Sequence, residues 1–497
     1  MKIVVIGAGI AGLSAAIYAS ECGYDVEVLE AHERAGGLAT NWERGGYTFE
    51  NSLHWLLGSR PGSPMHARWR ELFDIERLKF MYPEPFVRLE PAEGPALNVP
   101  RKVDQLEEEW LAYSPEDAEA TRRFAAQIRE LGKVNVPGME TGRVSNWLGM
   151  LLNVPHLPLL HELTTMTCEE YGAGFKNPVM RSFFQGEETG RMSAIAVLLS
   201  LAWTSEGDCG YPIGGSQAVI RAMVERLLEL GGKLHCNAKV AEIVAEDDAA
   251  VGVRLESGER IGADWVISGA DGHATIFDLL HERFADRETL RVYEEFEPFP
   301  SYLQVSLGVG RELKSQAGFA TWLLKYPMEI DPVTRATQLA MRFFHYDPTF
   351  APQGSTAVTC VIPTRNSGYW MGLRQRDPER YGQKKQEIAE SVMAEMERRI
   401  PGTRELIEVT DVASPATLVD CTGNWQGSME GWLLTPHTGY QMLPNTLPGL
   451  SKFYMVGQWI MPGGGLPSGP LTARPAIEAI CAHDHIPFTA GKKFQAA

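Results

Sequence analysis

The stretch KIVVIGAGIAGLSAAIYASECGYDVEVLE, residues 2–30, decides the fold of this chain. Residues 2–6 form a short apolar run, as in a buried parallel strand. Glycines at positions 7, 9 and 12 make a turn that opens a helix rich in small residues. A second apolar run, residues 25–29, ends at Glu30. The stretch therefore predicts a β-α-β unit.

The glycines of this unit have the spacing of a dinucleotide-binding turn, Gly7-x-Gly9-x-x-Gly12. Gly7 permits the tight turn, Gly9 lets the backbone approach a pyrophosphate, and Gly12 lets the helix pack closely on the strand. The helix N-terminus presents free N–H groups to phosphate, and Glu30 is placed to accept hydrogen bonds from ribose hydroxyls. The residues that we expect to hold the dinucleotide here are Gly7, Ala8, Gly9, Ile10, Ala11, Gly12, Glu30 and Ala31.

Composition places the chain among ordinary globular proteins of more than one domain. It has 497 residues, of which 44% are hydrophobic and 22% charged. The formal net charge of −17 argues against a general affinity for nucleic acid or anionic lipid, since both require dense Lys and Arg. Hydrophobic substrates remain compatible with this charge.

Cysteine and histidine usage gives no sign of a disulfide framework or a metal site. The seven cysteines are scattered, with no pair at CxxC spacing, which is typical of reduced thiols in a cytoplasmic protein.

No uninterrupted apolar run is long enough to span a membrane. The N-terminus superficially resembles a secretion signal, but its glycine spacing fits the dinucleotide turn, so we expect it to belong to the mature chain.

Nucleotide-binding features occur at the start, in the middle and near the end of the chain, which indicates interleaved domains. A glycine pair at 214–215 opens a second helix, strands follow up to residue 267, and a strand at 453–456 precedes a glycine-rich turn and a last helix. We predict an α/β fold with a Rossmann-like domain and a mixed-sheet and helical substrate or cap domain. The Rossmann-like domain comprises residues 1–85, 205–285 and 446–497, and the substrate domain comprises residues 86–204 and 286–445.

A second glycine element follows the first unit at Arg34, Gly36 and Gly37. A basic residue and two glycines just after Glu30 suit a second backbone pass over the same diphosphate, an element that simple NAD dehydrogenases lack. This segment and residues 453–480 resemble the matching parts of the amine oxidase and phytoene desaturase flavoproteins, which close over a flavin. The resemblance implies that the cofactor is FAD.

The same resemblance implies the remaining cofactor contacts. The family places a backbone contact to adenine at the position of Val240, and it approaches the flavin after the C-terminal strand. The implied FAD-binding residues outside the first unit are Arg34, Gly36, Gly37, Leu38, Ala39, Thr40, His54, Trp55, Val240, Gly457, Gln458, Gly465, Leu466 and Pro467.

Within this superfamily the chain is most similar to phytoene desaturases, carotenoid isomerases and retinol saturases. The motifs GGYTFE at 45–50 and GGGLP at 463–467 carry the likeness. It implies an FAD-dependent oxidoreductase that desaturates, saturates or isomerises carbon–carbon bonds of an isoprenoid, polyene or lipid-like substrate. Many desaturases have a small, glycine-containing segment after the Phe-acidic pair, whereas this chain has NSLHW at 51–55. We therefore expect a different substrate pocket.

Two alternative functions remain open at this point. A flavin amine oxidase would need a compact aromatic cage with a polar entry, and a non-catalytic prenyl or lipid carrier on the same fold would have degraded FAD motifs. Oligomeric state and direction of electron flow stay undetermined.

Candidate catalytic residues are few, because a flavin itself takes or gives the electrons. His54 and Trp459 are favoured by their expected positions near the ring. The other candidates for proton transfer are Glu50, Glu187, Glu188, His345 and His437. Candidates for lining a lipid tunnel, each with core packing as the competing explanation, are Trp203, Trp370, Trp425, Trp432 and Tyr440.

The apolar stretch 146–163 is broken by Pro155 and Pro158. It suits either shallow contact with a membrane surface or, as the favoured interpretation, a cap over the substrate pocket. The expected location is cytoplasmic, peripheral to the membrane if the stretch docks there.

Overall fold

The structure is a computed structural model that describes residues 1–51, 53–134, 136, 139, 153–186, 188–439 and 442–491. Two of the residues singled out above, Glu187 and Tyr440, lie outside the described residues, as does the part 146–152 of the apolar stretch.

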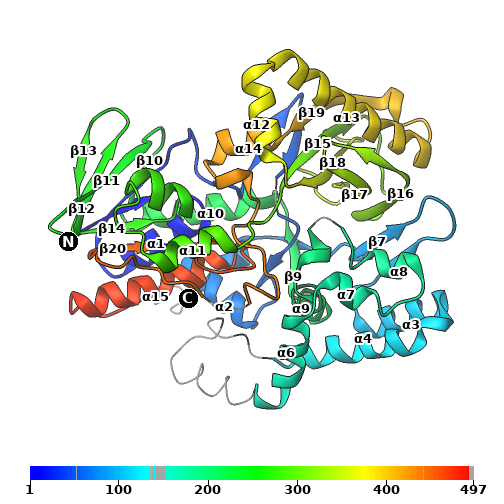
Figure 1. Cartoon of the computed structure of the whole chain (residues 1–497), viewed down its shortest axis with the longest axis horizontal. Helices are drawn as coiled ribbons and strands as arrows, with labels where there is room; N and C mark the ends of the chain where they lie inside the picture. The colour runs from blue at the N-terminus through cyan, green and yellow to red at the C-terminus, as the bar shows by residue number, and fades with distance from the viewer. Residues whose placement is uncertain are drawn as a thin grey trace.

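A five-stranded parallel sheet forms the core of the first lobe, at the left of Figure 1. The predicted β-α-β unit is its centre: β1 (Lys2–Ile6) leads through α1 (Ile10–Glu21) to β2 (Asp25–Leu29). The complete strand order is β10 (Lys233–His235), β2, β1, β14 (Trp265–Ser268) and β20 (Phe453–Met455). Strands from distant parts of the chain therefore share one sheet, and the predicted α/β architecture is confirmed.

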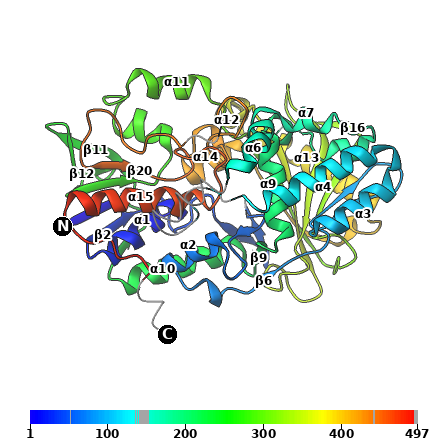
Figure 2. The ribbon, with the colours of Figure 1, turned by 90° about the horizontal axis from the view of Figure 1, so that it is seen from below.

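Helices on this sheet bring the end of the chain back to its beginning. The last helix, α15 (Ser468–His483), packs along α1, and α10 (Gly215–Glu229) contacts α1 as well. Red and blue ribbons accordingly lie side by side in Figures 1 and 2. A small antiparallel sheet borders this lobe and consists of β11 (Val240–Glu246), β12 (Ala249–Leu255) and β13 (Arg260–Gly262).

The second lobe is built on a mixed seven-stranded sheet. Its order is β19 (Ile407–Ala413), β15 (Ser301–Val309), β18 (Thr356–Thr364), β17 (Arg335–Phe343), β16 (Phe319–Glu329), β7 (Val87–Glu90) and β8 (Leu97–Val99). Only the β16–β7 pair is parallel. Side chains of its strands and of α13 (Pro378–Arg399) share one apolar core. The neighbouring helices are α12 (Ser367–Arg376) and α14 (Pro415–Thr422).

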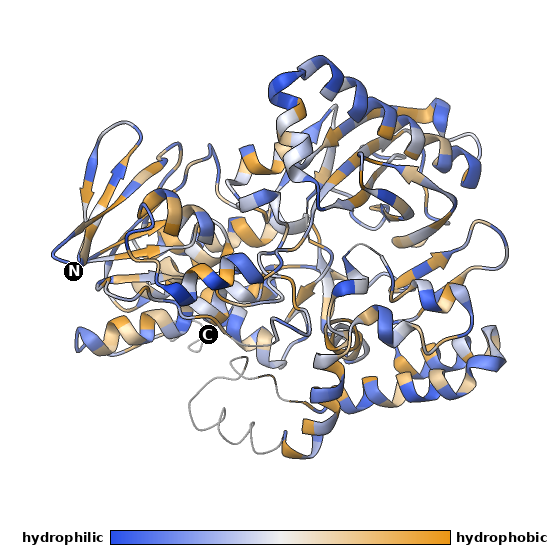
Figure 3. Cartoon of the chain, viewed as in Figure 1, coloured by the Kyte–Doolittle hydropathy of each residue, from blue (hydrophilic) through white to orange (hydrophobic). Residues whose placement is uncertain are grey.

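Helices cover the open end of this sheet, where β7 and β8 lie. Blue and orange alternate along α3 (Val103–Tyr113) and α4 (Ala118–Leu131) in Figure 3, as expected for helices with one buried face. Trp110 and Phe124 are fully buried between them. The other helices of this group are α6 (Leu157–Thr165), α7 (Cys168–Gly172), α8 (Pro178–Ser182) and α9 (Ala194–Ser205).

Short strands connect the lobes and frame the candidate site. β9 (Cys209–Pro212) pairs with both β5 (Leu56–Leu57) and β6 (Phe80–Met81). The remaining connecting elements are β3 (Asn41–Arg44), β4 (Tyr47–Glu50), α2 (Pro64–Leu72) and α11 (Arg287–Glu295). The domain boundaries drawn from the sequence remain a prediction.

No helix among the described residues is long and apolar enough to cross a membrane.

Candidate functional site

The first glycine turn is a cradle made of backbone. Gly7 has a φ of +87°, which favours glycine, and a Cβ on Gly12 would lie 1.9 Å from the Gly7 carbonyl oxygen. Gly9 differs, because its φ of −75° suits any residue and the nearest atom to an added Cβ is 3.8 Å away. Gly7 and Gly12 are thus required by the turn itself, whereas Gly9 keeps space open beside it.

Gly9 is also the N-cap of α1, and it has no side chain that could satisfy the free N–H groups of the first turn. No acidic residue lies in that turn either. The partial positive charge of the helix end is therefore available to an anionic ligand such as a diphosphate.

The Glu30 carboxylate lies at the edge of this turn. One oxygen accepts a hydrogen bond from the Ala8 N–H at 2.7 Å and the other accepts from the His32 N–H at 2.9 Å. The Glu30 carbonyl accepts from the Ala238 N–H, which brings the chain just before Val240 to the same edge. The predicted ribose and adenine positions are therefore adjacent.

The second glycine element lies directly against the first. Gly36 forms an isolated parallel bridge with Gly9, and its N–H donates to the Ala8 carbonyl at 3.0 Å. A Cβ on Gly37 would lie 3.5 Å from the Gly9 Cα. Of the nearby predicted residues, Ala31 and Arg34 are exposed, and Ala39 is buried.

The C-terminal segment reaches the same place. A Cβ on Gly457 would lie 2.9 Å from the Ala11 Cβ, and a Cβ on Gly469 would lie 2.5 Å from the Ile10 Cγ2. Glycines 463, 464 and 465 all have positive φ, so the turn that carries Leu466 and Pro467 depends on them. Three motifs far apart in sequence thus meet at the N-terminus of α1, and together they fit a bound dinucleotide.

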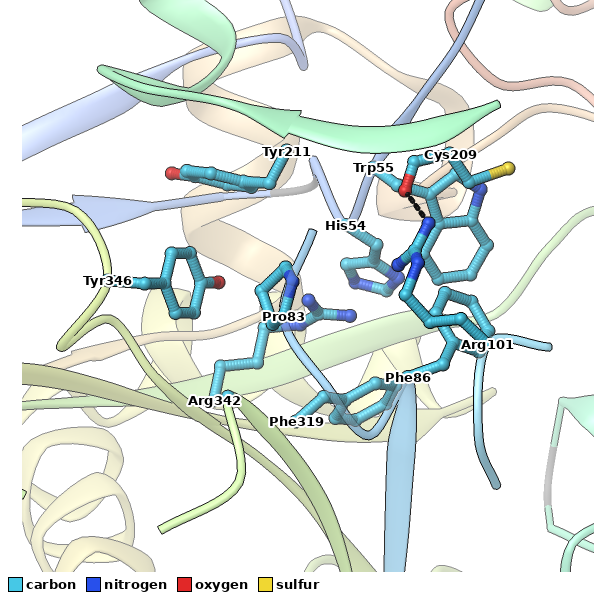
Figure 4. A pocket seen from close by; sticks show the side chains of 11 residues that line it. His54, Trp55, Pro83, Phe86, Arg101, Cys209, Tyr211, Phe319, Arg342 and Tyr346 are labelled. Atoms are coloured by element: carbon cyan, nitrogen blue, oxygen red, sulfur yellow. Dashed lines mark hydrogen bonds between the residues drawn. The ribbon is translucent and has the colours of Figure 1, made fainter. Parts of the chain in front are cut away.

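A cavity lies beside β9, where the two lobes meet (Figure 4). Its walls are mainly aromatic and its corners are polar. The lining residues are His54, Trp55, Pro83, Phe86, Arg101, Cys209, Tyr211, Gly318, Phe319, Arg342 and Tyr346. They come from six separate parts of the chain.

His54, the favoured catalytic candidate, points into this cavity (Figure 4). Its side chain is exposed to the cavity, and the protein atoms packed around it, together with the charge of Arg342, hold the pKa of its imidazole well below the usual value. Trp55 packs on Phe86 with ring centroids 4.9 Å apart. Neutral His54 therefore faces a predominantly apolar space.

Glu50 lies behind the cavity and joins β4 to α10. Its two carboxylate oxygens accept hydrogen bonds from the Ser216 N–H at 2.9 Å, the Ser216 hydroxyl at 2.7 Å and the Leu53 N–H at 3.3 Å. Burial raises the pKa of Glu50 to about 7, against the opposing effect of these hydrogen bonds. Glu50 thereby ties Leu53, the neighbour of His54, to the start of α10.

Two further carboxyl groups, those of Glu188 and Glu430, lie near the C-terminal glycine turn. An added Cβ on Gly464 would lie 2.1 Å from the Glu430 carbonyl oxygen. Burial raises the pKa of Glu188 to about 7, and burial plus the neighbouring Glu188 raises the pKa of Glu430 to about 8. Groups with such values can hold or release a proton near neutral pH.

The other candidates lie elsewhere. Trp459 is buried in an aromatic cluster, with its ring centroid 4.9 Å from that of Trp432, and it does not line the His54 cavity. His345 bonds to the Gln316 carbonyl at 3.0 Å, and exposed His437 lies 3.8 Å from Glu295. The remaining aromatic candidates, none of which lines the cavity, are Trp203, Trp370 and Trp425.

Sequence reasoning missed Arg101 and Arg342. The available signal was a single arginine inside an otherwise apolar strand, LAMRFF at 339–344. Whether such an arginine faces a cavity depends on strand register, because successive side chains point to opposite faces of the sheet.

Known proteins are similar to this chain over almost its whole length. A phytoene desaturase (lycopene-forming) from a Paracoccus species is 25% identical over 93% of this chain and 94% of that protein. Prolycopene isomerase 1 from an Oncidium hybrid cultivar is 24% identical over 93% of this chain and 81% of that protein.

Solved structures share the fold. A putrescine oxidase variant superimposes with a TM-score of 0.64 at 14% identity, covering 97% of this chain and 99% of that one. An oxidoreductase from Methanosarcina mazei gives a TM-score of 0.61 at 19% identity, covering 96% of this chain and all (100%) of that one.

The family model described as flavin containing amine oxidoreductase matches residues 10–476. That range includes Gly12 and the rest of α1, the second glycine element, the cavity and the C-terminal turn. The chain therefore belongs to the flavin-containing amine oxidoreductase family and is an oxidoreductase with FAD as its cofactor.

Proposed function

We propose that this protein acts on carbon–carbon double bonds of a hydrophobic polyene or isoprenoid substrate. The observation that carries the proposal is the similarity, over 93% of the chain or more, to proteins named phytoene desaturase and prolycopene isomerase. The aromatic cavity at the junction of the lobes supports it, because its walls suit an apolar, planar molecule.

The glycine cradle would hold FAD. Backbone N–H groups of the turn at 7–12 and the N-terminus of α1 would bind the diphosphate. The backbone at Gly36 and Gly37, which lies beside this turn, would cover the diphosphate. Glu30 would bind ribose hydroxyls, and the backbone at Val240 would contact adenine. Bound FAD supplies hydride or electron transfer, which desaturation, saturation and isomerisation all require.

The residues of the cavity would orient the substrate. Trp55, Phe86 and Phe319 would present aromatic faces to the substrate in the space that His54 faces. Glu430 would retain its proton at neutral pH and so be able to release one from its carboxyl oxygen, while Glu188 would share that role.

An amine substrate is less favoured than a polyene. Amines are protonated at neutral pH, and the cavity contains the positive charges of Arg101 and Arg342. A protonated amine would be repelled by both guanidinium groups, since their charges are buried and weakly screened. A non-catalytic carrier is excluded as the main function by the oxidoreductase family of the chain.

The experiment is an anaerobic assay of FAD-loaded protein with a panel of polyenes, analysed by HPLC. Turnover that begins with oxidised flavin would identify a desaturase, and double-bond change only after dithionite reduction would identify an isomerase or saturase. The FAD-free protein serves as the control. Hydrogen peroxide formation with amines, and no change in any polyene, would contradict the proposal.

We also propose peripheral membrane contact through the start of α6. Val154 and Leu157 are 55% and 54% exposed, whereas Leu163 is fully buried. This exposed apolar end suits shallow contact with lipid, and the buried end anchors the segment. Co-sedimentation with neutral phosphatidylcholine vesicles should fall for a Val154→Ser, Leu157→Ser variant, and unchanged sedimentation would favour the cap interpretation.

A further inference from the structure

The cavity around His54 contains two buried cations, Arg101 and Arg342, that form no ion pair with the residues that the structure describes. Arg342 is 5% exposed and Arg101 is 8% exposed. Within the described part of the chain, neither guanidinium has a carboxylate within ion-pair distance. Burying a charge without an ionic partner is costly, so an arrangement of this kind calls for a compensating group.

The N–H groups of Arg342 are incompletely satisfied. Among the described residues, its Nη2 has no hydrogen-bond partner. Arg101 differs in this respect, because its Nη2 donates to the Cys209 carbonyl at 2.6 Å. Figure 4 shows the Arg342 guanidinium directed into the cavity, toward His54. Arg342 thus interacts with the Tyr346 hydroxyl but keeps one buried nitrogen, Nη2, without a hydrogen-bond partner among the described residues.

Aromatic rings compensate only part of this charge. The Arg342 guanidinium carbon lies 4.2 Å from the Phe319 ring centroid, and that of Arg101 lies 5.4 Å from the Phe86 centroid. Stacking of this kind stabilises the face of the cation. The N–H edge, which is the part that forms hydrogen bonds, still points into the cavity.

Nearby carboxylates are already engaged elsewhere. The Glu50 oxygens accept hydrogen bonds from Ser216 and Leu53, and the Asp347 oxygens accept from Gly214 and Thr349. Each of these bonds ties a backbone turn, so neither carboxylate is available to Arg342 without breaking the local structure. Glu50 and Tyr346 therefore stabilise the charge of Arg342 only in part, and a ligand anion could satisfy its remaining N–H.

We propose that the cavity binds the carboxylate end of a substrate whose remaining body is apolar, with Arg342 as the principal donor. A guanidinium presents two parallel N–H groups that match the two oxygens of a carboxylate. The hydroxyl of Tyr346 and the imidazole of His54 line the same space and can donate further hydrogen bonds. The inference rests on the proposed function and specifies its substrate class, a polyene or isoprenoid acid in place of a pure hydrocarbon.

The test compares two probes that differ only in charge, all-trans-retinoic acid and its methyl ester. Equilibrium dialysis against FAD-loaded protein measures both dissociation constants. The acid is expected to bind about tenfold to a hundredfold more tightly than the ester, because only the acid can form a charge-assisted, bidentate contact with Arg342. Equal affinity for acid and ester, or no binding of the acid, would overturn the proposal. The wild-type protein is sufficient for this measurement.

Variants locate the effect. Arg342→Gln should abolish the preference for the acid while leaving ester binding within about twofold, and Arg342→Lys should restore part of it. The matched control is Arg335→Gln, which removes the same charge from the same strand at a side chain that is 70% exposed and paired with Glu329. A preference for the acid that survives in Arg342→Gln would contradict the assignment.

The outcome is separable from that of the polyene assay. Dialysis reports binding, and HPLC reports a change in the double bonds. Acid binding that depends on Arg342, without any double-bond chemistry, would support this inference and contradict the proposed reaction. Turnover of a neutral polyene, with no preference for binding the acid, would support the proposed reaction and contradict this inference.

Discussion

The glycine cradle and the His54 cavity are built from different materials. The cradle consists of backbone: Gly36 pairs with Gly9, and Gly457 approaches Ala11 to within side-chain contact. The cavity consists of side chains from six segments, and its polar members include His54, Arg101, Arg342 and the two tyrosines. A backbone site needs glycine at fixed spacing, whereas a side-chain site can be made from any elements that the fold brings together.

Because of this difference, the two sites should fail in different ways when they are altered. Substitutions in the cradle should act on cofactor retention or on the fold itself. Substitutions around the cavity should act on ligand preference and on the dependence of stability on pH.

The largest effect is expected from a pair of substitutions within the cradle. Gly12→Val places side-chain atoms on the Gly7 carbonyl, which an added Cβ already approaches to 1.9 Å, and should destabilise the fold by about 3 kcal/mol or more. Gly9→Val has space in the turn itself and should fold normally yet lose FAD. Thermal melts and the flavin absorbance of both purified variants measure the difference.

This pair separates a packing glycine from a ligand glycine. The FAD-free form of Gly9→Val should melt within a few degrees of the FAD-free wild type. A yellow, fully loaded Gly9→Val protein would show that the diphosphate does not pass over this turn.

A smaller effect is expected at Glu430, close to the glycine turn. Its carboxyl pKa is raised from 4.5 to about 8 in the folded protein, first by burial and then by Glu188. The stability that this group contributes is therefore complete below about pH 4.5, the value in the unfolded chain, and is lost as the pH rises toward 8. Glu430→Gln should remove a decline of about 2 kcal/mol over that interval, allowing for the partial exposure of the side chain.

Urea denaturation at a series of pH values measures this decline. Glu405→Gln, at an exposed position far from the cavity in sequence, is the control and should leave the profile unchanged. If the Glu430→Gln profile matches that of the wild type, ionisation of Glu430 does not destabilise the folded protein. The proton-transfer role proposed for Glu430 and Glu188 would then fail.

The smallest effect is expected at Trp459. Its substitution tests whether this side chain contacts FAD in addition to the glycine cradle. Its buried indole N–H has no hydrogen-bond partner among the described residues. If this N–H serves bound FAD, as its position two residues after Gly457 predicts, Trp459→Phe should weaken FAD binding about threefold to tenfold, the loss of one hydrogen bond. Fluorescence titration of the FAD-free protein with FAD measures this change.

An unchanged FAD affinity in Trp459→Phe would assign the side chain to the aromatic cluster alone. In that case stability should stay the same or rise, because an unsatisfied buried donor has been removed.

The sequence predicted the cradle because each of its motifs is a short pattern that can be recognised by itself. Residues 2–30 contain the strand, the turn, the helix and the acidic residue in order, and Gly36 and Gly37 follow directly. The segment 453–480 was recognised in the same way. The order of the strands in the parallel sheet then follows from ordinary β-α-β topology.

The cavity was not predictable in the same manner. Only His54 and Trp55 were anticipated, because they follow the recognised motif. Arg342 stacks on Phe319 because β17 and β16 pair in a register that places these two residues opposite each other. That register is a contact between strands separated by a hairpin, and nothing in the order of residues along either strand specifies it.

The packing of α15 along α1 has a consequence for biosynthesis. The glycine turn at the start of α1 leaves the ribosome long before Gly457 and the helix α15 that contains Gly469. Until they emerge, the apolar face of α1 lacks its partner, and closing so long a loop is slow. We therefore expect the cofactor to load only after the C-terminal segment has been made, and the uncovered face of α1 to favour aggregation until then.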